Sequence, residues 1–171
     1  MSSAGNQRHG THWRLGLVLV LAAFALDRGF KYWMLSVIGF APHSKVEVTG
    51  FFDLVMVWNR GISYGLFQQD SIWGQRVLLG LTLVIIAGVL YWLSRAGNRV
   101  LAAGLGLIGG GALSNAFDRF HYGAVADFFS FHAAGFYWYV FNLADVAIVA
   151  GVALLLYDTI MDGHKNAGKI N

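Results

Sequence analysis

The sequence contains no cysteine, a single proline and few charged residues. Without cysteine it forms no disulfide, offers no thiol nucleophile and has no cysteine ligand for a metal. Charged residues make up 12% of the 171 residues, against roughly 25% in an ordinary soluble domain. Because hydrophobic residues supply 57%, a soluble domain of this size would lack the charges to cover its surface. The composition therefore indicates an integral membrane protein.

The excess of basic residues does not indicate a nucleic-acid partner. The pI of about 9.3 comes from 12 Lys and Arg against 9 Asp and Glu, and these form no basic run. A face that binds nucleic-acid phosphates needs clustered Lys and Arg. We therefore expect no nucleic acid. The 22 glycines beside one proline are instead typical of closely packed apolar helices.

Four apolar segments are candidates for membrane spans, at about 14–37, 76–93, 99–118 and 138–157. A span needs about 20 residues, and in lipid its backbone must satisfy its own hydrogen bonds, which favours helices. The second and fourth segments meet this length alone. The first and third meet it only if their polar ends lie inside the membrane. The sequence predicts a single all-α membrane domain over residues 1–171 with four transmembrane helices.

The two long connectors, about 39–75 and 119–137, carry strand patterns. Residues 45–49 alternate with period two, and residues 51–58 form a β-rich run. Residues 126–136 repeat a weaker strand–turn–strand pattern. Both connectors fall on the same side of the predicted bundle. We therefore expect a small β-sheet or hairpin element at the outer membrane face.

The short link between the second and third segments orients the chain. It contains Arg95 and Arg99, and the positive-inside rule assigns such links to the cytoplasm. The complete Lys and Arg count divides evenly between the two sides, so the predicted orientation rests on this link. It predicts that both termini are cytoplasmic.

Small residues recur at four-residue spacing along the third segment. Ala102, Gly106, Gly110 and Ser114 would form one stripe on a helix, which permits close packing of a neighbouring helix. A glycine loop for phosphate is the alternative, but residues 109–111 lie inside an apolar run. Packing is the favoured interpretation.

Polar side chains interrupt the predicted spans at a common depth. At about 1.5 Å per residue, Asp27 and Asp145 lie about 20 and 18 Å from the predicted cytoplasmic end of their helices. Asn115 and Asp118 lie roughly 24 and 28 Å from that end. Asp127 falls in the outer connector. Charged residues within spans are costly and mark candidate functional sites, so the outer half of the bundle is the candidate site.

The four aspartates differ in the cations near them in the sequence. Asp27 with Lys31, and Asp118 with Arg119, are predicted structural ion pairs. Asp127 and Asp145 have no Lys or Arg within four residues. Two unpaired carboxylates that lie close together share a proton, so one serves as a base and the other as an acid.

Other chemistries fit less well. His121 and His132 flank Asp127, so a metal site is conceivable, but there is no His-Glu-x-x-His motif for a zinc protease. No Gly-x-Ser-x-Gly motif occurs. The glycine-bearing segment 59–65 is interpreted equally well as a substrate-binding loop or as an ordinary turn. We expect no metal and no cofactor.

Five short motifs, in order along the chain, resemble those of the lipoprotein signal peptidase (signal peptidase II) family of bacterial intramembrane aspartyl proteases. They are Asp27 with Lys31, residues 59–64, residues 110–119, residues 125–128 and residues 141–145. The resemblance spans about residues 14–158. Two departures, Ile62 and Tyr64, concern substrate contacts in the loop that follows Asn59.

The resemblance implies that Asp127 and Asp145 are catalytic. It implies supporting or substrate-binding roles for Asp27, Lys31, Asn59, Gly61, Asn115, Asp118, Arg119 and Asn142. It further implies a multi-pass protein of the bacterial cytoplasmic membrane with its active site near the outer face.

The implied reaction is removal of the signal peptide from prolipoproteins, just before a diacylglyceryl-modified cysteine. The partners would be the lipid-modified prolipoprotein and membrane lipids, and the protein would be a monomer. A proton-coupled transporter is the alternative, because intramembrane carboxylates also build proton relays. Its path would need polar groups at several depths, and the second and third segments are apolar through their inner halves. A membrane scaffold would explain the glycine stripe but not the unpaired aspartates.

Overall fold

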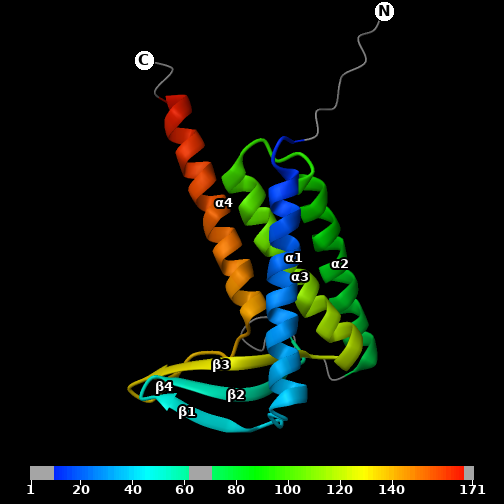
Figure 1. Ribbon diagram of the computed structural model, residues 1–171, viewed down its shortest axis with the longest axis vertical. Coiled ribbons are helices and arrows are strands. Elements are labelled where there is room, and N and C mark those ends of the chain that lie inside the picture. Colours follow the sequence, from blue (N-terminus) through cyan, green and yellow to red (C-terminus); the bar gives the residue numbers. More distant parts are fainter. Residues whose placement is uncertain (1–9, 62–70, 168–171) are drawn as a thin grey trace, which may run out of the picture.

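The computed structural model describes residues 10–61 and 71–167, with side chains through residue 161. Four long helices form a bundle, and a small sheet lies across one end of it (Figure 1). The helices are α1 (Trp13–Tyr32), which continues as the short π-helix η1 (Trp33–Val37), α2 (Ile72–Leu93), α3 (Arg99–Tyr122) and α4 (Leu143–Ala167). The first turn of α1 and the last turn of α4 lie at the end opposite the sheet (Figure 1).

Three of the helices are long and apolar enough to cross a membrane. They are α2, α3 and the part of α4 over Leu143–Met161. Helix α1 differs because Asp27, Arg28 and Lys31 lie in its second half. The fold is thus mostly helical, with three candidate spans and a small sheet.

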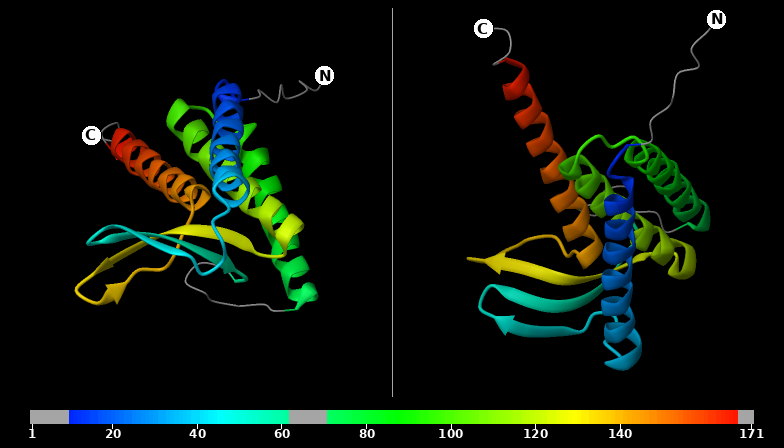
Figure 2. Two further views of the ribbon diagram at one scale, coloured as in Figure 1. Left: turned by 60° about the horizontal axis from the view of Figure 1, so that its bottom comes forward. Right: turned by 45° about the horizontal axis from the view of Figure 1, so that its top comes forward.

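Helix α3 is the central helix of the bundle and packs against the other three (Figures 1 and 2). The predicted small-residue stripe faces α1: a Cβ atom placed on Gly110 would lie 2.5 Å from the carbonyl oxygen of Val20. A second set of glycines faces α4, where a Cβ on Gly104 would lie 2.9 Å from the carbonyl oxygen of Gly151. The stripe prediction is confirmed, and the structure adds a second glycine face.

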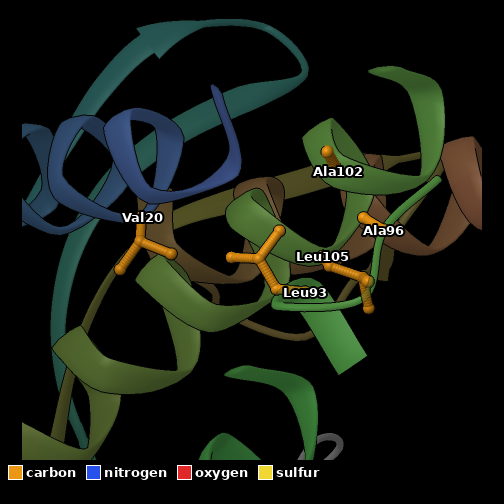
Figure 3. Packing of buried hydrophobic residues seen from close by; sticks show 5 residues of the cluster. All are labelled: Val20, Leu93, Ala96, Ala102 and Leu105. Carbon is orange, nitrogen blue, oxygen red and sulfur yellow. The ribbon is translucent and has the colours of Figure 1, made fainter. Parts of the chain in front are cut away.

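A hydrophobic cluster closes the bundle near the α2–α3 link (Figure 3). Its buried members are Val20, Leu93, Ala96, Ala102 and Leu105. The small side chains let the link lie close to α1. This packing fixes α3 relative to α1, and the polar residues farther along both helices meet as a result.

The sheet has four antiparallel strands in the order β1-β2-β3-β4. They are β1 (Lys45–Thr49), β2 (Phe52–Asn59), β3 (Val125–Ala133) and β4 (Phe136–Tyr137). The predicted strand patterns in the two connectors are therefore confirmed as one sheet. In its register Val57 pairs with Asp127 and Asn59 pairs with Val125, so the end of β2 lies beside Asp127.

The ends of the helices differ from the predicted segments. Helix α4 begins at Leu143 rather than near residue 138, because Phe141 hydrogen-bonds to Phe129 of β3 in both directions. Helix α2 begins at Ile72, since the Ser71 hydroxyl accepts from the Gly74 N–H and caps the helix. Helix α3 continues to Tyr122 and ends in the left-handed Gly123.

Candidate active site

Asp127 and Asp145 meet where the sheet joins the bundle. Asp127 lies on β3 and is 1% exposed, and Asp145 lies in the first turn of α4 and is half-buried. Asn142 contacts both: its side chain donates to Asp127 and its backbone N–H donates to Asp145. No ion pair to either aspartate occurs among the described residues.

Each of the four carboxylate oxygens accepts one hydrogen bond from an amide. Asp127 accepts from Asn59 Nδ2 at 3.0 Å and from Asn142 Nδ2 at 2.6 Å. Asp145 accepts from Asn115 Nδ2 at 2.9 Å and from the Asn142 backbone at 3.2 Å. Neutral donors hold both carboxyl groups in place and leave their net charge uncompensated.

The three asparagines are themselves fixed in orientation. The side-chain oxygen of Asn59 accepts from the Gly61 N–H at 2.9 Å, and that of Asn142 accepts from the Asp145 N–H at 2.9 Å. The oxygen of Asn115 accepts from Lys31 Nζ at 3.2 Å and from Asn142 Nδ2 at 3.1 Å. Because every oxygen is engaged elsewhere, each NH₂ group is directed at a carboxylate.

A second cluster of carboxylates lies between α1 and α3, next to the first. Lys31 Nζ lies 2.8 Å from Asp27 and 2.7 Å from Asp118, and Arg28 pairs with the other oxygen of Asp118. Asp27, Lys31 and Asp118 are fully buried. Two acids and two bases balance in charge. The predicted Asp27–Lys31 pair is confirmed.

The predicted ion pair between Asp118 and Arg119 is wrong. Asp118 pairs with Arg28 and Lys31, whereas Arg119 Nη2 donates to the Gly61 carbonyl oxygen at 2.9 Å. Neighbouring residues on a helix point in different directions, so the pair cannot meet on one face. Arg119 instead connects α3 to the end of β2.

The two histidines that flank Asp127 in the sequence do not converge on it. His132 Nε2 lies 3.2 Å from Asp53, and the His132 ring stacks on Tyr137. The ring of His121 contacts that of Tyr122. Within the described ranges there is no group of three or more His, Cys, Asp or Glu side chains placed to hold a metal ion.

Burial sets the protonation of Asp127. It raises the pKa of the Asp127 carboxyl to about 7, and the nearby charge of Asp145 acts in the same direction. Hydrogen bonds from Asn59 and Asn142 oppose this rise, because they favour the ionised form. A carboxyl group that titrates near neutrality can both hold and release a proton.

Two hollows meet at Asp145. One, of about 700 Å³, lies between the aromatic side chains of the sheet and the Val146 and Val149 face of α4. The other, of about 310 Å³, lies among α2, α3 and α4 and is lined by Asn115 and Arg119. An extended chain can therefore reach Asp145 along apolar surfaces from two sides.

All ten residues expected at the site fall within the described structure, and they gather at this junction. Ile62 and Tyr64, the two departures in the loop, lie outside the described residues. Sequence reasoning missed Arg28, which pairs with Asp118, and the hydroxyl of Ser114, which donates to Asp27 at 2.6 Å. The signal for Arg28 was a second basic residue beside Asp27 within a predicted span.

Comparison with known proteins gives one consistent result. The model of the family described as signal peptidase (SPase) II matches residues 19–161. A lipoprotein signal peptidase from Nitrobacter hamburgensis is 50% identical over 155 residues, which cover 88% of this chain and 94% of the relative. One from Methylorubrum extorquens is 48% identical over 150 residues, covering 88% of each chain.

The fold also resembles a solved structure. A bacterial membrane enzyme determined at 2.3 Å by the in meso method matches with a TM-score of 0.78 over 91% of this chain and 94% of that one. The identity is 21%, so this likeness concerns the fold alone.

Proposed function

The chain belongs to the signal peptidase II family, and we propose that Asp127 and Asp145 are the two catalytic residues with which it removes signal peptides from prolipoproteins. The observation that supports this assignment most strongly is the environment of the two carboxyl groups. Both accept hydrogen bonds from neutral amides only, and no described cation pairs with them. The buried aspartates of the neighbouring cluster, Asp27 and Asp118, are instead neutralised by ion pairs.

The proposed mechanism is general acid–base hydrolysis of a peptide bond. A water molecule between the two carboxyl groups loses a proton to the ionised aspartate and attacks the scissile carbonyl carbon. The protonated aspartate donates to the carbonyl oxygen. The proton taken from water then passes to the leaving amine as the C–N bond breaks. At the same time the aspartate that protonated the carbonyl oxygen takes a proton back from a hydroxyl of the tetrahedral intermediate. This leaves a carboxylic acid product and restores one shared proton on the pair. The raised pKa of Asp127 fits a carboxyl group that holds this proton near neutral pH.

The remaining site residues are proposed as positioning residues. Asn59, Asn115 and Asn142 aim their NH₂ groups at the carboxylates. Lys31 holds the oxygen of Asn115, pairs with Asp27 on its own helix and ties α1 to α3 through Asp118. The Gly61 N–H donates to the side-chain oxygen of Asn59, and Arg119 donates to the Gly61 carbonyl oxygen. Together they hold Asn59 at the end of β2.

The hollows on either side of Asp145 are the proposed route of the substrate. Their lining is mostly apolar, which suits both an apolar signal helix and the acyl chains of a diacylglyceryl-modified cysteine. We propose that cleavage occurs just before that cysteine. The reaction needs no metal or cofactor in this scheme, so a chelator is expected to leave it unchanged, whereas activity lost to a chelator and restored by zinc would contradict it.

We further propose that the whole chain is one multi-pass domain with four spans, α1 included. The charges of α1 support this, because they are buried against α3 rather than directed toward lipid. Both termini would be cytoplasmic, with the sheet and the aspartates near the outer face of the bacterial inner membrane, and the protein would act as a monomer. Cysteines placed singly at Asn98 and Ser71 test the orientation in intact cells. An impermeant thiol reagent should label position 71. Labelling of position 98 alone would show that the orientation is the opposite of the one proposed.

The activity test is release of a signal peptide from a lipidated prolipoprotein by the purified protein. Asp127→Asn and Asp145→Asn should each abolish release. Asp53→Asn is a matched control, because Asp53 is equally buried on the same sheet but pairs with Lys45 at 3.0 Å. Near wild-type release by either of the first two variants would overturn the assignment.

A further inference from the structure

A third hollow, basic in character, lies at the sheet end of the bundle beside the proposed active site, with which it shares Arg119. It has a volume of about 500 Å³ and lies between the start of α2 and the end of α3. Arg60, Arg76 and Arg119 line it, and none of its described lining residues is Asp or Glu. Such a concentration of positive charge attracts an anion.

The arginines are suitably placed for a phosphate group. Arg76 is exposed and its guanidinium lies 5.0 Å from the ring centre of Trp73, which leaves its planar edge available for hydrogen bonds. Arg119 uses Nη2 to hold Gly61, while its buried Nε has no hydrogen-bond partner within the described ranges. Guanidinium groups bind phosphate oxygens through paired N–H donors.

This basic hollow continues into an apolar groove. The groove has a volume of about 250 Å³ and runs among α1, α2 and α3. Leu79 and Phe120 line both hollows, and beyond them the groove is lined by Phe24, Leu83 and Phe117. A basic end joined to an apolar channel along the spans matches the two ends of a phospholipid.

The position of the aromatic residues agrees with such a ligand. Trp73 and Phe120 are among the most exposed large side chains, at 73% and 76%. Trp73 lies in the first turn of α2 and Phe120 in the last turn of α3, and these two helix ends line the same hollow. Aromatic side chains collect where the lipid headgroups meet the hydrocarbon. The basic hollow therefore lies at headgroup level when the helices span a membrane.

We propose that this continuous hollow binds one anionic phospholipid, with its phosphate between Arg76 and Arg119 and an acyl chain along Leu83 and Phe117. A free anion would use the basic end only and would leave the groove unexplained. The site lies on the side of α3 away from α4, so it is separate from the hollow lined by Val146 and Val149. It reaches the catalytic pair only through Arg119, which holds Gly61 and thereby Asn59.

Native mass spectrometry of the full chain, released from nanodiscs with equal amounts of anionic and zwitterionic phospholipid of the same acyl chains, tests the proposal. The wild type should retain one anionic lipid in preference to the zwitterionic lipid. Arg76→Gln should weaken this retention roughly tenfold, since it removes one charge-assisted hydrogen bond. Arg76→Lys keeps the charge and should retain most of the binding.

Matched controls lie on α2 or just beyond its end. Arg95 stacks on Tyr91 at 4.7 Å near the opposite end of α2, so Arg95→Gln removes a similar stacked charge at a distant place and should change nothing. Leu83→Trp fills the groove and should also lose the lipid, whereas Val84→Trp, on an exposed neighbour that does not line the groove, should not.

The outcomes separate the possibilities. Equal loss in Arg76→Gln and Arg95→Gln, or no preference in the wild type, would overturn the site. If inorganic phosphate displaced the lipid and Leu83→Trp still bound it fully, the hollow would be a site for a soluble anion and not for a phospholipid. Melting temperatures confirm that each variant is folded. Because the readout is lipid retention, it is independent of whether Asp127 and Asp145 are catalytic.

Discussion

Two pairs of buried aspartates lie side by side in this protein, and their surroundings differ. Asp27 and Asp118 contact Lys31, and Asp118 also contacts Arg28, so this cluster is electrically balanced. Asp127 and Asp145 receive only amide N–H donors. The same residue type at a similar depth is therefore held in two ways.

The comparison shows that the partners of a buried carboxylate determine its role. A carboxylate with a cationic partner acts as a structural link, because its removal would leave a buried cation unpaired. A carboxylate with neutral donors keeps its position yet can exchange a proton. If the two pairs responded alike to loss of their charge, their different surroundings would not determine their roles.

The largest expected effect is on catalysis. Asp127→Asn or Asp145→Asn should lower the cleavage rate by about 10²–10⁴-fold or more, because an amide keeps the shape but cannot exchange the proton. The double variant should be little slower than either single one, since the two groups act as a unit. Single-turnover rates on a lipidated prolipoprotein measure this. Additive losses would show that the two aspartates act independently.

A large loss of stability is expected in the ion-paired cluster. Asp118→Asn leaves Arg28 and Lys31 with one carboxylate between them, and breaking a buried pair costs about 3–5 kcal/mol. Asp27→Asn should likewise reduce stability or substrate binding more than the chemical step. Melting temperature in detergent, measured with the cleavage rate, distinguishes these effects. If Asp118→Asn were stable but inactive, Asp118 would belong with the catalytic residues.

Packing of α1 on α3 keeps the two pairs adjacent, and it can be tested at a glycine. Gly110→Leu should destabilise the protein by about 1–3 kcal/mol or more, because the added side chain meets the Val20 backbone. Gly88→Leu is the control, since no atom lies within 4 Å of a Cβ placed at Gly88. Equal melting temperatures for the two variants would show that the α1–α3 contact is looser than described.

The smallest expected effect is the pH dependence of stability. The pKa of Asp127 rises on folding from 3.8 to about 7. Its protonated form therefore stabilises the fold most fully below pH 3.8, and this contribution is lost as the pH rises through 7. Between pH 8 and pH 6 the wild type should gain on the order of 1 kcal/mol relative to Asp127→Asn. If the melting temperatures of the two proteins changed equally between pH 8 and pH 6, this titration of Asp127 would be contradicted.

Much of the site was predictable because a membrane sequence makes polar residues conspicuous. Asp27 and Lys31 lie four residues apart, which places them on one face of a helix. The absence of cations near Asp127 and Asp145 was also visible in the sequence. The strands were predictable from alternation over residues 45–49. These features depend on local spacing, which the sequence displays directly.

Other features depend on how distant elements meet, and the sequence did not show them. Asp118 finds Arg28 across the α1–α3 contact, so the adjacent Arg119 was a misleading partner. Helix α4 begins late because residues near Phe141 pair with β3. The contact of Gly104 with α4 likewise required the packed bundle.

The most direct test of the central claim compares Asp127→Asn with Asp118→Asn at pH 8 in the same detergent, measuring melting temperature and cleavage rate for both. We expect Asp127→Asn to be inactive with a melting temperature equal to or above that of the wild type, because it removes an uncompensated buried charge. We expect Asp118→Asn to melt well below the wild type. Normal cleavage by Asp127→Asn, or an equal fall in melting temperature for both variants, would contradict the distinction between the two pairs.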